Sequence, residues 1–437
     1  MNATDRPTFP ALRLPQFADE ALPEVVTAAL HHPIAPALDD VAAATRSALE
    51  KSRRFARLAP GASVAITCGS RGIASKPLVV ATAVAWLKEK GFAPFIVPAM
   101  GSHGGGRAES QTALLAELGY TPESMGCPIE SSMEVVRIGT TSQGIPVWFD
   151  KNASAADAVL VVNRIKAHTS FDRKIESGLT KMVAIGLGKA EGARSIHRLG
   201  AAGYLEVLPE WANIAIAEAP IAYAIGIVEN ADKKAAVIEG AEPEDIAAVD
   251  ARLLPTAKAN TPKLPFEKID VLVVERIGKN ISGTGMDTGV VGRADIRGRP
   301  NNDNPLIHKL AVLGLTPEAH GNGLGLGLAD FMTVEAANSL DLYAMYMNSC
   351  TSTFTERVRL PIVLADEKEV IRAAVATCWR LDGGAARLCI IRSTLHLDRV
   401  LLSPALAEEL GEAGEILDSP RPLEFDGAGR LTTRCPQ

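Results

Sequence analysis

The chain has 437 residues, of which 47% are hydrophobic and 22% are charged, and its formal net charge is −6. This composition is typical of a globular protein, and the length exceeds one ordinary hydrophobic core, so we expect two domains. The mildly acidic balance gives neither the basic footprint of a nucleic-acid binder nor a polybasic patch for a membrane surface.

The N-terminal residues and the cysteines indicate in which cellular compartment the protein is expected. The first residues, MNATDRPTFPALRLP, carry charge and proline where a secretory signal needs an apolar run, and the most apolar stretch, residues 219–228, is too short to span a bilayer. Six cysteines occur without a CxxC pair, which argues against a zinc ribbon, an iron–sulfur motif or a disulfide scaffold. We therefore expect a cytoplasmic enzyme, with its oligomeric state left open.

Strand-like and helix-like segments alternate in the first part of the chain, as in parallel α/β sheets. The predicted strands are residues 62–67, 93–99 and 159–165 and a segment near residue 225, the predicted helices are 76–91 and 107–118, and a hairpin is expected from 133–138 and 145–150.

A linker is predicted at residues 254–266, where three prolines interrupt a segment without hydrophobic periodicity. Beyond it, a second α/β unit begins with a strand at 269–277 and a glycine-rich loop at 278–293. We therefore predict an N-terminal α/β domain over residues 1–260 and a C-terminal α/β domain over 261–437. Mostly parallel sheets and an active-site cleft between the two domains complete the expected fold.

Polar segments follow four of the predicted strands, where parallel sheets bind their ligands. They contain Arg71, His103, His168 and Lys279. Only eight histidines occur in the chain, and imidazole both titrates near neutrality and ligates metals. This pattern predicts a site in a cleft.

Each of these residues also has a purely structural interpretation. His103 could be a turn residue, His168 a satisfied core histidine, and Arg71 a cap on the sheet edge. Lys181 and Lys189 could be solvated helix lysines, the more common role of a lysine. His197 lies in a helix-like segment where a surface histidine is common.

The arrangement of these residues resembles the nickel-dependent lactate racemase family, whose members carry a nickel-pincer nucleotide. TCGSRGIASKP matches the turn with an arginine, GSH matches the turn with a histidine, and a second histidine, a lysine in SGLTKM and a third histidine follow. The matching residues are Arg71, His103, His168, Lys181 and His197. The spacing of Lys181 and His197 agrees with the family without a gap.

The resemblance implies a racemase or epimerase of a 2-hydroxy acid, in which Cα passes hydride to the cofactor and recovers it on either face. His103 and His168 would be the two bases, since the two enantiomers present their hydroxyls in opposite directions. Arg71 would clamp the carboxylate, and His197 would complete a square-planar nickel site.

The cofactor would lie on Lys181, Ser177 and Gly178, and Lys279 would reach substrate or a cofactor phosphate. The resemblance also implies cofactor-synthesis enzymes as partners. Lys174 competes with Lys181 as the residue that tethers the cofactor.

The chain also departs from the family. Cys68 occupies a position that is acidic in the family, the loop at 169–180 is longer, and His103 is followed by glycines. A 2-hydroxy acid other than lactate is therefore expected. Two alternatives remain open: a metal-dependent hydrolase using the three histidines, and a non-catalytic nucleotide- or metabolite-binding protein.

Overall fold

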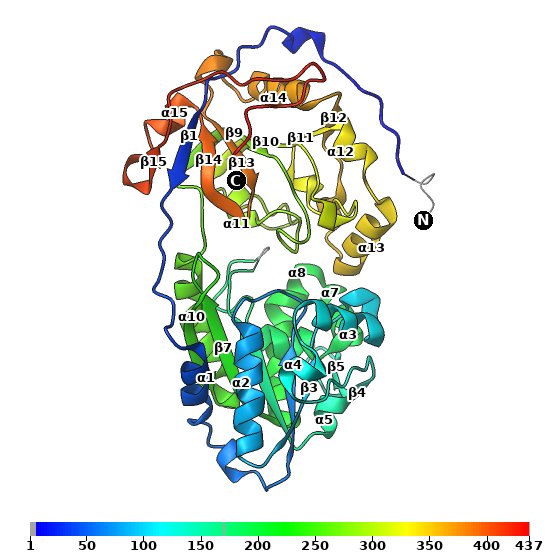
Figure 1. Cartoon of the computed structure of the whole chain (residues 1–437). Helices are drawn as coiled ribbons and strands as arrows, with labels where there is room; N and C mark the ends of the chain where they lie inside the picture. Colours follow the sequence, from blue (N-terminus) through cyan, green and yellow to red (C-terminus); the bar gives the residue numbers. More distant parts are fainter. Residues whose placement is uncertain (1–5, 169–170, 437) are drawn as a thin grey trace. The chain divides into compact units, whose positions relative to one another are not determined.

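The computed structural model describes residues 6–168 and 171–436, which divide into two compact α/β units (Figure 1). Residues 33–261 form one unit, and the segment up to His32 folds with everything from Pro262 onward to form the other. The sequence predicted one domain over residues 1–260, whereas in the structure the segment up to His32 belongs to the same unit as the residues from Pro262 onward. The physical reason is that this segment contributes a strand to the sheet of the C-terminal unit.

The sheet of residues 33–261 has five strands among the described residues, in the order β3-β2-β6-β7-β8. Neighbouring strands are parallel except for β7 and β8, which pair antiparallel. The strands are β2 (Ser63–Cys68), β3 (Ala93–Pro98), β6 (Ala158–Arg164), β7 (Ile221–Glu229) and β8 (Ala235–Ala241). The strands predicted at 62–67, 93–99 and 159–165 are thus β2, β3 and β6.

Helices and a hairpin complete this unit. The predicted hairpin is β4 (Val135–Thr140) with β5 (Pro146–Asp150). The helices are α1 (Val41–Leu49), α2 (Lys76–Glu89), α3 (Ala108–Glu117), α4 (Pro122–Met125), α5 (Lys151–Ala155), α6 (Leu179–Lys181), α7 (Lys189–His197), α8 (Gly200–Ala202), α9 (Leu208–Glu218) and α10 (Ile246–Ala259). Two π-helical turns, Met182–Gly186 and Gly203–Val207, follow α6 and α8.

The linker predicted from residue 254 begins too early, because α10 continues to Ala259 with Pro255 inside it. Proline costs a helix one hydrogen bond and is normally a breaker. Here Leu253, Leu254 and Ala257 are all buried, so the apolar face of the helix extends past the proline. Packing of that face overrides the local preference.

The sheet of the second unit has eight strands in the part of the chain that the structure describes, in the order β12-β11-β10-β9-β13-β14-β1-β15. The first five are mutually parallel, whereas β14, β1 and β15 join by antiparallel pairing. The strands are β1 (Val26–Leu30), β9 (Lys268–Val274), β10 (Leu306–Val312), β11 (Phe331–Thr333), β12 (Ile362–Leu364), β13 (Leu388–Ser393), β14 (His396–Leu402) and β15 (Gly414–Ile416).

Apolar side chains cover both faces of this second sheet. In β9, Ile269, Leu272 and Val274 belong to one buried cluster and Val271 and Val273 to another. A parallel strand buried on both faces has a continuous hydrophobic sequence, as IDVLVV does. The helices of this unit are α11 (Thr288–Val291), α12 (Val334–Asn338), α13 (Leu342–Ser352), α14 (Glu367–Ala376) and α15 (Pro404–Ala407).

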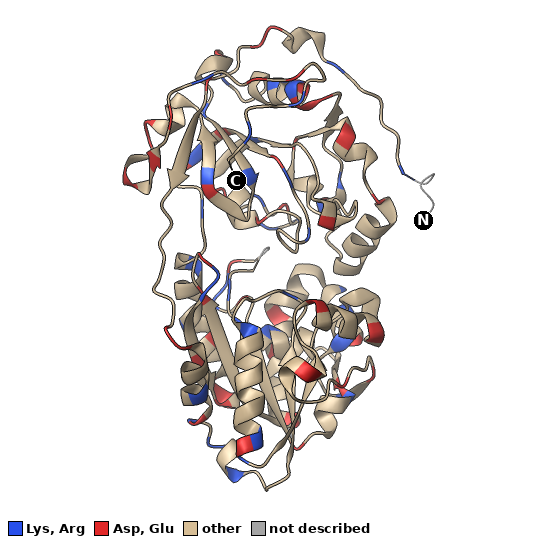
Figure 2. Ribbon diagram, viewed as in Figure 1, with Lys and Arg blue, Asp and Glu red and all other residues tan. Residues whose placement is uncertain are grey.

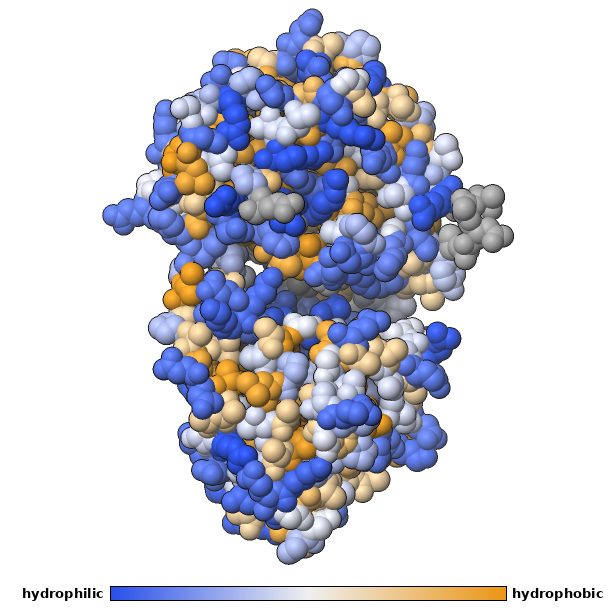
Figure 3. Space-filling view, in the orientation of Figure 1, coloured by the Kyte–Doolittle hydropathy of each residue, from blue (hydrophilic) through white to orange (hydrophobic). Residues whose placement is uncertain are grey.

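Charged residues of both signs are interspersed along the ribbon of each unit (Figure 2). The face shown in Figure 3 is mostly hydrophilic, with hydrophobic residues in scattered groups. Among the described residues, no helix is both long and apolar enough to cross a membrane.

Candidate functional site

Three neighbouring strands of the first unit end at one edge of the sheet and carry the predicted site residues. Strand β2 leads into Arg71, β3 into the turn with His103, and β6 into His168. The carboxyl ends of parallel strands lie together, so the three loops converge. A hydrogen bond between Ser70 Oγ and His103 Nδ1 joins the first two loops directly.

A buried glutamine stabilises the turn that carries His103. Gln111 Nε2 donates to the carbonyl oxygens of Gly101 at 3.1 Å and of His103 at 3.0 Å. Gly101 has a φ of +59°, a conformation that glycine adopts without the strain of a side chain. The position of His103 is therefore fixed through its backbone, which leaves the orientation of its ring to Ser70.

A buried carboxylate fixes the backbone of His168. Glu176 Oε2 accepts the His168 N–H at 2.5 Å, while Glu176 Oε1 accepts the Arg173 N–H at 3.0 Å. Lys258 on α10 pairs with the same carboxylate at 2.5 Å. The loop after β6 is thereby tied to α10 across the unit. The neighbouring residues 169 and 170, part of the loop in which this chain departs from the family, lie outside the described residues.

Lys181 is positioned by the cap of its own short helix. Asp250 accepts the backbone N–H groups of Leu179 at 2.9 Å and Thr180 at 2.7 Å at the start of α6. A Cβ on Gly178 would lie 2.2 Å from Asp250 Oδ1, so only glycine permits this cap. Ser177 pairs with Lys166 through backbone hydrogen bonds of 2.8 and 3.2 Å. These local roles account for Ser177 and Gly178, and cofactor contacts for them remain a prediction.

Tyr204 joins three site residues through its ring. The ring centroid lies 5.5 Å from His197, nearly parallel at 19°, and 5.4 Å from His168. Lys181 Nζ lies over the same ring at 5.8 Å from its centroid, and Phe171 packs against both Tyr204 and His168. Two imidazoles and one amine therefore converge on a single buried tyrosine.

Positive charge concentrates around Lys181. The pKa of Lys181 is lowered to about 7, first by burial and in addition by the nearby charges of Lys166, Arg71 and Arg173. Desolvation by the surrounding protein also lowers the pKa of Arg71, although this residue is exposed at the surface, and the charge of Arg164 adds to the effect. Such a group of cations suits an anionic ligand. Arg71 is one of the charges that act on Lys181.

The structure distinguishes among the three candidate lysines. Lys181 faces Tyr204, whereas the side chain of Lys174 is exposed. Lys189 is fully buried, with its Nζ 2.7 Å from Asp150 Oδ2 and 2.5 Å from the carbonyl oxygen of Pro98. The expectation of a solvated Lys189 is therefore wrong: the ion pair joins the start of α7 to the end of β5, and the hydrogen bond to Pro98 joins it to the end of β3.

Cys68 is fully buried at the end of β2, beneath the loop that carries Arg71. Burial raises the pKa of its thiol to about 12, despite the opposing charge of Lys76. The thiol is therefore neutral near pH 7 and a poor nucleophile. Lys76 is buried as well, and burial lowers its pKa to about 8.

Lys279 belongs to the other unit, where it follows β9. Its Nζ donates to Asn348 Oδ1 of α13. Its predicted role at the substrate or a cofactor phosphate remains a prediction, as does the cleft between the domains.

Residues 16–203 match the lactate racemase N-terminal domain. Residues 16–203, somewhat less than half of the chain, therefore carry the N-terminal domain of that family, which confirms over this region the resemblance seen in the sequence. The structure is similar to that of the lactate racemase apoprotein from Thermoanaerobacterium thermosaccharolyticum, with a TM-score of 0.51 and 14% sequence identity over 85% of this chain and 99% of that one. At that identity the likeness shows a shared fold. No curated protein sequence matches the chain.

Sequence reasoning missed the residues that hold the family residues in place. Tyr204 lies in the turn Gly203–Val207, whereas α7 ends at His197, so no single helix carries both residues and no periodic pattern relates them. Glu176 and Asp250 gave no signal in the sequence either, because each acts on backbone groups far away in the chain or across a loop.

Proposed function

We propose that the chain is a racemase or epimerase of a 2-hydroxy acid other than lactate, working with a nickel-pincer nucleotide. The observation that carries the proposal is the convergence of Lys181, His168 and His197 on the ring of Tyr204. The family match supports racemase chemistry, and the surrounding cations support an anionic substrate and cofactor.

The described residues fit such a cofactor. Lys181 would hold it, because an amine with a pKa of about 7 is about half in its neutral, nucleophilic form at pH 7, far more than an ordinary lysine. His197 would supply an imidazole nitrogen, a good ligand for nickel. Among the described residues, no group of three or more His, Cys, Asp or Glu could hold a metal ion, so the remaining ligands would come from the cofactor. When bound, it would supply reversible two-electron chemistry at the substrate Cα.

The side chains of the protein would orient the substrate and move its hydroxyl proton. Arg71 makes no ion pair with any described residue and is available to bind the substrate carboxylate in a bidentate manner. His103 and His168 would each accept the hydroxyl proton from one enantiomer, and the other histidine would donate a proton to the oxygen when the opposite enantiomer forms. Ser70 would keep the His103 ring in a fixed tautomer and orientation.

A substrate other than lactate is supported by Cys68. A neutral buried thiol at a position that is acidic in the family removes one negative charge from beneath the Arg71 loop. This change favours more anionic or differently shaped acids. The hydrolase alternative gains no support, since the three histidines do not form a group that could hold a metal among the described residues.

The test is to produce the chain together with cofactor-synthesis enzymes and to measure nickel content, near-ultraviolet absorbance and interconversion of a panel of chiral 2-hydroxy acids. We expect His197→Ala to lose nickel, while His31→Ala, a histidine on the other unit bonded to the Glu412 carbonyl, retains it. Unchanged nickel in His197→Ala would refute the ligand assignment. Stoichiometric zinc would support the hydrolase alternative. A protein that contains neither nickel nor zinc would support the non-catalytic binding protein.

A further inference from the structure

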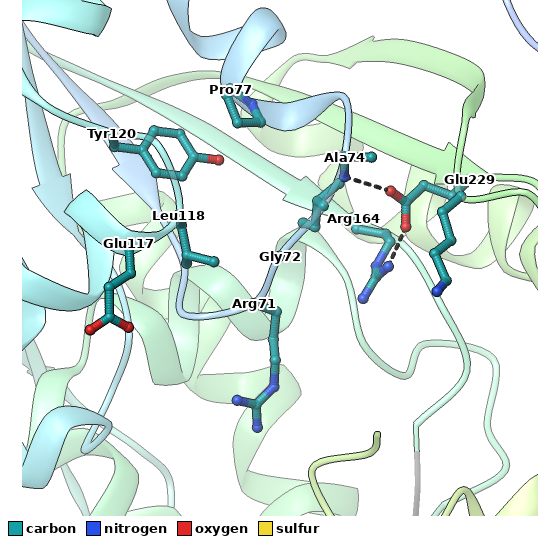
Figure 4. Close-up of a pocket in the computed structure, with 11 residues that line it drawn as sticks. Arg71, Gly72, Ala74, Pro77, Glu117, Leu118, Tyr120, Arg164 and Glu229 are labelled. Carbon is teal, nitrogen blue, oxygen red and sulfur yellow. Dashed lines mark hydrogen bonds and ion pairs between the residues drawn. The ribbon is translucent and has the colours of Figure 1, made fainter. Parts of the chain in front are cut away.

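A hollow of about 430 Å³ lies beside the loop that carries Arg71, within the unit formed by residues 33–261 (Figure 4). Four segments that are distant in the sequence line it: residues 71–77, the region after α3, the end of β6, and the β7–β8 hairpin. Its volume falls within the range of small-molecule sites. A three-carbon acid would leave most of this space empty.

Some of the charged side chains that line the hollow already have a partner of opposite charge, and others do not. Glu229 pairs with Arg164 and also accepts the Ala74 N–H at 3.2 Å, so its carboxylate is already engaged on both oxygens. Figure 4 shows this carboxylate between Arg164 and the Ala74 backbone, with the Arg71 guanidinium directed elsewhere. The one remaining acid in the lining is Glu117, which is exposed.

Two cations of the lining are left without a carboxylate. Neither Arg71 nor Lys233 makes an ion pair with any residue that the structure describes, and both line the hollow. Lys233 is held in the hairpin turn by its backbone, since its N–H donates to the Asn230 carbonyl at 2.9 Å. Its φ of +62° is also unusual for a lysine. The turn therefore presents this lysine at the rim without using its side chain for folding.

We propose that this hollow binds a second anionic group of the substrate, so that the substrate is a 2-hydroxy acid with a distal carboxylate or phosphate. The inference rests on the proposed function, because Arg71 stands at the junction and binds the reacting carboxylate. Lys233 and the part of the Arg164 guanidinium that does not pair with Glu229 then bind the distal anionic group. Glu229 keeps Arg164 oriented, and Leu118 and Ile73 border the carbon chain between the two acids.

The test measures equilibrium binding to the apoprotein by calorimetry, which requires no nickel cofactor. The probes are hydroxybutanedioate, 2-hydroxybutanoate of the same chain length, and inorganic phosphate. We expect the diacid to bind about tenfold more tightly than the monoacid, in line with charge-assisted hydrogen bonds to the second carboxylate. Lys233→Gln should remove about three- to tenfold of that advantage and leave the monoacid unchanged.

Lys234→Gln is the matched control, because Lys234 is an exposed neighbour in the same turn and does not line the hollow. It should bind both acids as the parent does. Equal affinity for the two acids, with no effect of Lys233→Gln, would overturn the proposal. Phosphate binding that depends on Lys233, without any preference for the diacid, would also overturn it and show a site for a free anion.

The outcome is separable from that of the proposed function. A diacid preference that depends on Lys233 in a protein without racemase activity would sustain the binding site and reject the chemistry. Racemase activity on monoacids and diacids with equal kcat/KM would sustain the chemistry and reject the second anionic site.

Discussion

The ring of Tyr204 stacks on the imidazole of His197, with 5.5 Å between their centroids and 19° between their planes. The same ring lies against His168 and beneath Lys181. One side chain thus sets the separation and orientation of three residues to which the proposed function gives three different tasks. Tyr204 acts through them and is a positioning residue.

Replacement of Tyr204 tests this role. Tyr204→Leu should lower kcat about 10- to 100-fold and weaken nickel retention, because loss of a stacked ring leaves both imidazoles free to rotate. Tyr204→Phe keeps the ring and should retain most activity. Racemisation rates and nickel content measured on both variants distinguish the cases. Equal losses in Phe and Leu variants would instead assign the role to the hydroxyl.

The reactivity of Lys181 should depend on pH in a distinctive way. Because its pKa is lowered to about 7, the amine is mainly neutral above pH about 8, and its labelling rate with an amine-reactive reagent should level off there. Ordinary exposed lysines have pKa values near 10.4, so their rates should continue to rise to pH about 10. Peptide mass spectrometry after brief labelling of the apoprotein measures each rate.

A neighbouring charge supplies the control for that experiment. Lys166 is one of the cations that lower the pKa of Lys181. Lys166→Gln removes the repulsion, so the protonated form becomes more favourable and the plateau should move to higher pH. If the plateau of Lys181 labelling stays at the same pH, or moves to lower pH, the charge of Lys166 does not lower the pKa of Lys181.

The two histidines should show opposite stereochemical preferences. His103→Ala and His168→Ala should each lose interconversion in both directions by about 10²- to 10⁴-fold, since a complete cycle needs both bases. In a single turnover, each variant of the loaded enzyme should still form the 2-keto acid from one enantiomer, and the preferred enantiomers should be opposite. Chiral analysis of the remaining substrate reads out the preference. The same preference in both variants would refute the two-base assignment.

The buried pair of Lys189 and Asp150 should be important for folding. Lys189→Met leaves a buried carboxylate without its cation and should lower the free energy of unfolding by about 3 kcal/mol. Lys151→Met removes the exposed pair with Glu134 and should cost less than about 1 kcal/mol. Denaturant titrations of the two variants make the comparison. A loss for Lys189→Met as small as for Lys151→Met would mean that the pair contributes little.

Periodic and local sequence patterns were sufficient to predict the α/β class and most strands of the first unit. Strand β6 illustrates the reason: its run of buried apolar residues ends in polar ones where the strand leaves the core. The family motifs around Arg71 and His103 are local as well, because each residue lies in a short turn directly after a strand. The positions of the site residues at strand ends could therefore be predicted from the sequence.

The tertiary structure decided what depends on distant partners. Strand β1 finds β14 and β15 almost 400 residues away in the chain, as in the pairing of Val26 with Leu402, and no local pattern contains that information. The burial of Lys189 depends on Asp150 and Pro98, and the cap on α6 depends on Asp250 from another helix. A side chain's charge, burial and orientation are set by whatever folds against it. The sequence thus determined where the candidate site residues lie in the chain, and the packing of remote segments determined how they are held.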